Sequence, residues 1–151
     1  MEALEPILTA HPFLKGLEAR HLKLLVECAS QVSFDAGQFL CREDEEASQF
    51  YLIYHGKVAV EIFRSRRGPV TIQTLSEGEV LGWLWFLKPY HWHLDARAME
   101  PTRAISLKVK CLLEKCDQNH ELGYELMKRY AHNLAVQFRV TKLQLLDIYG
   151  G

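Results

Sequence analysis

The sequence predicts a mainly β protein: a double-stranded β-helix jelly-roll barrel with helices before it and one long helix after it. Short segments that alternate apolar and polar residues, with turn residues about every 8–12 positions, predict the barrel. Helical spacing of apolar residues predicts the flanking helices. We expect one domain over 1–151, with N-terminal helices over 1–30, the barrel over 31–108 and C-terminal helices over 109–149.

The N-terminal part carries one apolar face at helical spacing, formed by Leu17, His21, Leu24, Leu25 and Cys28. Before this face, Pro12–Leu14 predicts a short turn between two helical pieces.

The central part contains segments with strand character at 31–34, 38–41, 50–54, 57–63, 70–75, 94–99 and 103–107. Gly37, Gly56 and Pro101 stand between consecutive segments, and glycine adopts the positive φ of tight turns at low cost. This spacing is typical of a closed antiparallel barrel.

The segment from Asn119 to Asp147 has no proline and predicts one long helix with an apolar stripe. The stripe is longer than one small barrel can cover, so we expect a second copy of the chain to cover the remainder. The alternative is a helix that packs wholly on its own barrel. The predicted dimer-helix residues are Leu126, Met127, Tyr130, Asn133, Leu134, Gln137, Val140 and Thr141, with Asn133 and Gln137 fixing the register.

Composition excludes several classes of protein. The net charge of −1 lacks the basic excess of a free-standing nucleic-acid binder. No apolar run is long enough for a membrane span, and the acidic N-terminus lacks the features of a signal peptide, so we expect a cytoplasmic location. The four cysteines form no CxxC pair, and in a reducing compartment we expect free thiols at Cys28, Cys41, Cys111 and Cys116.

Three local motifs occur in order: Phe34-x-x-Gly37, the run 50–58, and Leu75-x-x-Gly78-Glu79-x-x-Gly82. With them the chain resembles the cyclic-nucleotide-binding domain of catabolite-activator (CRP/FNR-type) regulators. Residues 143–150 resemble the end of the dimer helix of that family and the hinge after it. In the regulators a winged helix-turn-helix DNA reader follows, and none follows within these residues. We therefore expect no direct DNA binding by this chain, which either acts alone or is the sensor half of a regulator.

The resemblance implies a phosphate-binding cassette over 78–94, in which a helix N-terminus receives the cyclic phosphate. Family members add a glutamate for the ribose and an arginine for the phosphate. Here Trp83 stands at the glutamate position, and the arginine position falls near Trp92 and His93. A cyclic nucleotide is one candidate ligand, but these replacements argue against it unless Arg97, Lys88 or a protonated histidine substitutes. The predicted pocket residues are Gly78, Gly82, Trp83, Leu84, Trp92, His93, Leu94 and Arg97.

Two interpretations of the aromatic segment 83–92 remain. The aromatic side chains fill the pocket as ordinary core, or they line a pocket remodelled for a flat or apolar ligand. The sequence leaves the ligand unidentified.

His91-x-His93 resembles a cupin metal site, but the glutamate such a site needs is replaced by Ala96 or Arg97. We predict no metal site and, with no catalytic motif, a non-enzymatic ligand sensor; a cupin-like metal enzyme is the remaining alternative. Asp44 stands where the family usually has a glycine, and aspartate tolerates left-handed backbone.

Overall fold

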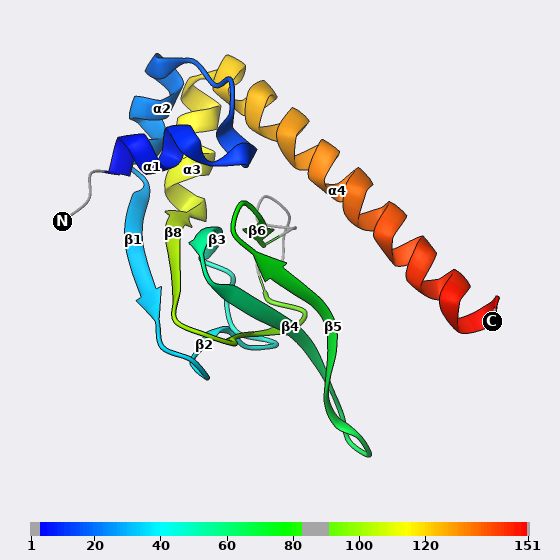
Figure 1. Ribbon diagram of the computed structural model, residues 1–151. Coiled ribbons are helices and arrows are strands. Elements are labelled where there is room, and N and C mark those ends of the chain that lie inside the picture. Colours follow the sequence, from blue (N-terminus) through cyan, green and yellow to red (C-terminus); the bar gives the residue numbers. More distant parts are fainter. Residues whose placement is uncertain (1–3, 83–90, 151) are drawn as a thin grey trace.

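The computed structural model describes residues 4–82 and 91–150, without the side chain of Arg64. Figure 1 shows a layer of helices above two sheets, with the last helix running out past a long hairpin. The elements are α1 (Leu4–Ala10), the 3-10 helix η1 (Pro12–Leu14), α2 (Ala19–Val26), β1 (Ala29–Phe34), β2 (Phe39–Cys41), β3 (Gln49–His55), β4 (Lys57–Arg64), β5 (Gly68–Ser76), β6 (Val80–Leu81), β7 (Asp95–Ala98), β8 (Thr102–Lys108), α3 (Val109–Gln118) and α4 (His120–Tyr149).

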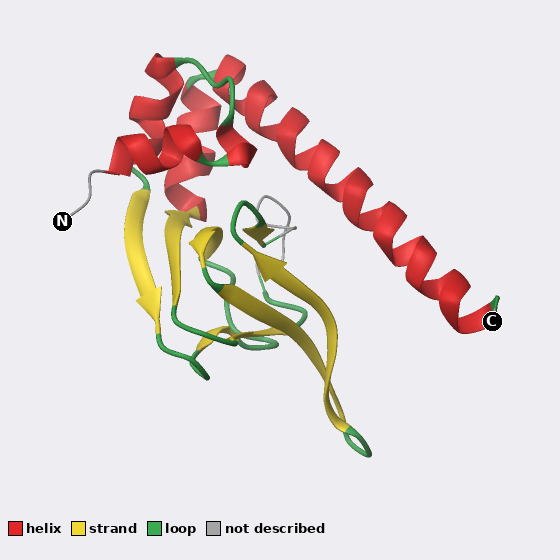
Figure 2. Cartoon of the chain, viewed as in Figure 1, coloured by secondary structure: helices red, strands yellow, loops and turns green. Residues whose placement is uncertain are grey.

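The strands form two antiparallel four-stranded sheets, in the orders β1-β8-β3-β6 and β2-β7-β4-β5 (Figure 2). This arrangement confirms the predicted jelly roll with N-terminal helices and a long C-terminal helix. Every predicted strand is present, with its ends shifted by a few residues. Strand β6 was not predicted, because two residues are too few to show an alternating pattern.

Strands β3 and β8 are buried on both faces, which explains the continuous apolar run of 50–54. Phe50 and Leu52 point to the helices, whereas Tyr51 and Ile53 point into the barrel. The molecule therefore has two apolar cores on opposite sides of one sheet.

The helix η1 is fastened to the barrel by His11. The backbone N–H of Phe13 donates to Nδ1 of His11 at 3.2 Å, so Nε2 carries the proton and donates to the carbonyl of Ile53 at 3.0 Å. Next to this contact, a Cβ on Gly78 would lie 3.2 Å from Cγ of Pro12. The turn between β5 and β6 thus lies directly against η1.

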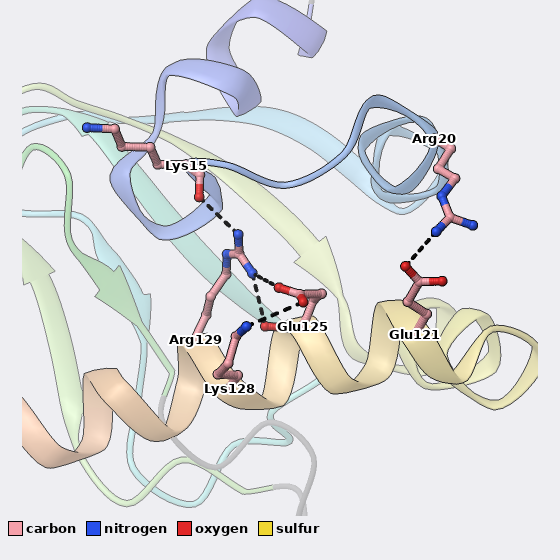
Figure 3. A network of polar contacts seen from close by, with 6 residues as sticks. All are labelled: Lys15, Arg20, Glu121, Glu125, Lys128 and Arg129. Atoms are coloured by element: carbon pink, nitrogen blue, oxygen red, sulfur yellow. Dashed lines mark hydrogen bonds and ion pairs between the residues drawn. The ribbon is translucent and has the colours of Figure 1, made fainter.

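The first half of α4 belongs to the body of the molecule. Leu122, Leu126 and Tyr130 are buried among the other helices. Figure 3 shows polar contacts along the same stretch: Arg129 donates to the carbonyl of Lys15 at 2.9 Å and pairs with Glu125 at 2.6 Å. The bond from Arg129 lowers the pKa of Glu125.

The second half of α4 has few contacts with its own chain. Gln73 of β5 donates to Gln137 at 2.7 Å, and Gln144 donates to the carbonyl of Ile72 at 3.3 Å. Its large apolar side chains are exposed, among them Phe138, Leu143, Leu145, Leu146 and Ile148.

The expectation of four free thiols is wrong, because Cys28 and Cys111 form a disulfide. Strand β1 pairs with β8 so that Ala29 lies opposite Leu107, which places the residue before β1 beside the first turn of α3. The two cysteines are 83 positions apart in sequence, so only the strand pairing reveals their proximity. Cys41 and Cys116 are free.

Asp44 has a φ of 70°, the left-handed geometry expected for it. Within 4–82 and 91–150, no helix combines the length and apolarity that crossing a membrane requires.

We predict that acid weakens the fold through His11. Burial holds the pKa of His11 below its ordinary value of 6.5, so the unfolded chain takes up the proton more readily than the folded one. The stability contribution of neutral His11 is therefore present above about pH 6.5 and is lost as the pH falls below it. Urea unfolding between about pH 7.5 and 5.5 should show a smaller pH dependence for His11→Gln than for the parent. The same substitution at exposed His120 controls for loss of an imidazole, and equal slopes for parent and His11→Gln would contradict the prediction.

Candidate functional site: an apolar cavity inside the barrel

A cavity of about 260 Å³ opens between the two sheets, at the side where β6 and the segment before β7 meet. Its lining is mostly aliphatic and aromatic. The described residues that line it are Ala47, Gln49, Phe50, Val60, Ile62, Leu75, Leu81, Gly82, His91, Trp92, His93 and Leu94.

Gly82 closes one end of the cavity, and its backbone requires glycine. Its φ is 121°, and a Cβ there would lie 2.5 Å from Cβ of Phe50. The lack of a side chain lets the end of β6 approach β3, so that the cavity is bounded by backbone at this point.

Trp92 forms the wall next to Gly82, with Cη2 of its indole 3.4 Å from where a Cβ on Gly82 would lie, and it is 8% exposed. Its backbone N–H donates to the carbonyl of Glu45 at 2.9 Å, and its carbonyl accepts from the N–H of Asp44 at 2.8 Å. An isolated bridge between Glu46 and His91 extends this contact. The charged loop 42–46 therefore fixes the backbone of Trp92, from which the indole extends.

Polar side chains at the floor of the cavity are satisfied by one another. Ser106 donates to Oε1 of Gln49, whose Nε2 donates to the hydroxyl of Tyr51 at 2.7 Å. Tyr51 in turn donates to the carbonyl of Leu40, and burial raises its pKa to about 12. Among the described lining residues, His91 and His93 also carry polar side chains, and both are exposed at the rim.

The structure brings four of the predicted pocket residues together: Gly82, Trp92, His93 and Leu94. Trp83 and Leu84 lie outside the described residues. Gly78 does not line the cavity but packs against Pro12 on the helical side of β6. The sequence analysis missed the lining residues from β3, β4 and β5. In β4 these are Val60 and Ile62, alternate apolar residues that share one face of the strand.

The expectation that Arg97 lines the pocket is also wrong. Ala96 and Ala98 point into the barrel, so Arg97 between them points outward. Its guanidinium donates to both carboxylate oxygens of Glu61, at 3.1 and 3.0 Å. This bidentate contact raises the pKa of Arg97 and satisfies the buried carboxylate. Arg97 therefore supports β4 and β7 from outside and is not available to an anion inside.

Within the described residues, His91 and His93 find no third partner for a metal ion. Among the residues with described positions, no group of three or more histidine, cysteine or acidic side chains could hold one. The described part of the chain gives the cupin-like alternative no support.

The model of the cyclic nucleotide-binding domain family matches residues 31–119, more than half of the chain. The chain belongs to the cyclic nucleotide-binding domain family. Human cGMP-dependent protein kinase 2 is 36% identical over 72 residues, which are 46% of this chain but 9% of the kinase. The chain therefore corresponds to a small part of that relative.

Solved structures share the fold. A protein from Geobacter metallireducens, assigned as a cyclic nucleotide-binding protein, has a TM-score of 0.79 and 25% identity over 91% of this chain and 99% of its own. The sensor domain of the transcriptional regulator DNR from Pseudomonas aeruginosa has a TM-score of 0.72 and 19% identity over 89% and 91% of the two chains. The regulatory subunit of a cAMP-independent protein kinase A from Trypanosoma brucei, as a triple mutant bound to cAMP, has a TM-score of 0.70 and 25% identity over 91% and 49%.

In this cyclic nucleotide-binding domain the predicted dimer-helix residues fall into two groups. Leu126 and Tyr130 are buried within the chain itself, with Met127 and Leu134 packed against them, so these residues seat the helix. Val140 and Thr141 are exposed, whereas Gln137 bonds to Gln73 and partly buried Asn133 lines a groove beside η1. The dimer remains a prediction.

We predict that Gly82→Ala destabilises the barrel more than Gly37→Ala. Both positions have a positive φ, which costs a residue with a Cβ about 1 kcal/mol or more. Only at Gly82 does the added carbon also collide with the core, which costs roughly 1–3 kcal/mol more. Chemical denaturation should give a free-energy loss for Gly82→Ala at least about twice that for Gly37→Ala. Equal losses would show that β6 does not approach β3 as described.

Proposed function

We propose that this domain is a non-enzymatic, dimeric ligand sensor whose cavity takes a small uncharged ligand in place of a cyclic nucleotide. One observation carries the proposal: among the described residues that line the cavity there is no carboxylate and no guanidinium. The ribose and phosphate of a cyclic nucleotide need such groups, because an unpaired phosphate charge is poorly stabilised in an apolar site.

The size and lining of the cavity indicate the class of ligand. A cavity of about 150 Å³ with apolar walls holds one benzene molecule. The cavity here, at about 260 Å³, has room for a compound of one or two rings. His91 and His93 at the rim offer hydrogen bonds to a polar edge of such a compound.

The described lining also supports a binding function over catalysis. It includes no hydroxyl, thiol or carboxylate that could act as a nucleophile beside the two histidines. Regulator and kinase-subunit names among the structural neighbours support a sensor role. One structural neighbour is named as the regulatory subunit of a cAMP-independent protein kinase A. This name supports the idea that a domain of this fold can take part in regulation without cAMP. We expect a cytoplasmic location.

Strand β6 offers a path from the cavity to α4. Leu81 lines the cavity, and its neighbour Val80 lines a groove of about 550 Å³ between η1, the β5–β6 turn and α4. A ligand that displaces Leu81 also moves Val80 and Gly78 against Pro12. This movement reaches the groove that α4 lines and so acts on the position of α4.

The exposed half of α4 supports a dimer. One seam of the helix repeats at alternating spacings of three and four residues, as in a coiled coil. Its members are Met127, Ala131, Leu134, Phe138, Thr141, Leu145 and Ile148. Met127 and Leu134 also pack on the core of their own chain, so the most exposed part of the seam runs from Phe138 to Ile148. Phe138 lies at the centre of this seam and is 63% exposed in the single chain, so a second α4 would bury it.

We predict that indole stabilises the protein, whereas cyclic AMP and cyclic GMP do not. Indole is uncharged and fits the cavity, so at millimolar concentration it should raise the midpoint of thermal unfolding in scanning calorimetry, while either nucleotide at about 100 µM should not. Ala47→Phe, which fills the cavity from its rim, should abolish the indole effect. Stabilisation by a cyclic nucleotide, or an indole effect that survives Ala47→Phe, would contradict the assignment.

We predict that Phe138→Ser weakens the dimer. Loss of a central apolar contact should raise the dimer dissociation constant by about tenfold or more in analytical ultracentrifugation. Leu143→Ser is the matched control, since Leu143 is similarly exposed, at 57%, but lies on the opposite side of the helix from the seam. A parent chain that stays monomeric at micromolar concentration would refute the dimer.

A further inference from the structure

We infer that Cys28 and Cys111 are a reversible thiol–disulfide pair that controls how firmly α3, and α4 after it, are held to the barrel. The bond joins the junction of α2 and β1 to the first turn of α3. This inference does not depend on the ligand proposed above.

The fold brings the two sulfur atoms together without needing the bond. Ala29 pairs with Leu107, and the N–H of Lys108 donates to the carbonyl of Cys28 at 3.0 Å. The Cα atoms of the cysteines are therefore held 5.6 Å apart, within the range a disulfide requires. Because strand pairing and core packing supply this proximity, we expect the reduced chain to keep its fold with two adjacent thiols.

The remaining two cysteines are poor competitors for exchange. The thiolate is the reactive form of cysteine, and burial raises the pKa of both Cys41 and Cys116. For Cys41 the carboxylate of Asp95 raises the pKa further. Thiol–disulfide chemistry is thereby restricted to one pair.

The two sulfur atoms of the pair differ in access. Cys28 is 2% exposed, whereas Cys111 is only partly buried. The thiolate of a small thiol such as glutathione attacks Sγ of Cys111, the protein S–S bond breaks, and Cys28 leaves as a thiolate that takes up a proton. A second glutathione thiolate attacks the sulfur of the bound glutathione, which releases Cys111 as a thiol. The balance is one protein disulfide and two glutathiones in, two protein thiols and one glutathione disulfide out.

The bond lies where it affects α4. Residues 29–110, which contain both sheets, lie between the bonded cysteines, so the disulfide ties the two ends of the barrel together. Only Asn119 separates α3 from α4. Reduction leaves the start of α3 held by non-covalent packing alone, and we expect local opening of α3 to become more frequent.

The first test equilibrates the whole chain with mixtures of reduced and oxidised glutathione and stops the exchange with acid. The free thiols are then alkylated in denaturant at neutral pH and counted by mass spectrometry. We expect one two-electron transition, from four alkylated cysteines under reduction to two, on Cys41 and Cys116, with the Cys28 and Cys111 peptides joined. Four alkylated cysteines in every mixture, or a bond that is reduced only after unfolding, would overturn the inference.

The second test compares the folded redox states by hydrogen exchange. Residues 109–118 and the first turns of α4 should exchange at least about threefold faster when reduced, while the β4–β5 hairpin should be unchanged. Cys28→Ser and Cys111→Ser should each match the reduced state in both oxidising and reducing buffer. Cys116→Ser, on the same helix as Cys111, is the control and should keep the transition. Reduced protein that exchanges like the oxidised form, or that unfolds globally, would show that the pair is not a local control.

Discussion

Strands β3 and β8 carry apolar side chains on both faces, and the rest of the molecule is arranged around that burial. One face, through Tyr51 and Ile53, completes the interior of the barrel. The other face, through Phe50 and Leu52, receives the helices. A sheet with two apolar faces must be covered twice, so the barrel cannot shed its helices without exposing a core. We therefore expect a shift of β3 or β8 to change the packing of both cores, the one inside the barrel and the one under the helices.

Two local features shape the described part of the cavity. The close approach at Gly82 and the wall at Trp92 preserve a space between the sheets. Arg97, one of the predicted phosphate partners, instead neutralises Glu61 on the outer face. A ligand entering the described cavity would gain mainly from removal of apolar surface from water, which favours uncharged compounds.

Two features connect this space to the helix that would meet a partner. In strand β6, Leu81 lines the cavity and Val80 lines the groove beside α4, so this short strand connects the two spaces. His11 fastens η1 to β3, the β5–β6 turn packs against η1 at Gly78, and the disulfide fastens α3 to the residue before β1. These are the contacts through which we expect a ligand, a proton or a thiol to act on the position of α4.

The sequence by itself determined the architecture. Strand alternation, turn glycines and a proline-free helix reflect the conformational preferences of residues close together in the chain, so they can be recognised without the tertiary structure. It also predicted Gly82, Trp92, His93 and Leu94 at one site and the left-handed backbone of Asp44. Only the tertiary structure decided that Arg97 faces outward and that Gly78 supports η1, since strand register and the packing of η1 set those directions. It alone paired Cys28 with Cys111, because contacts between residues 83 positions apart arise from strand pairing and leave no trace in local spacing.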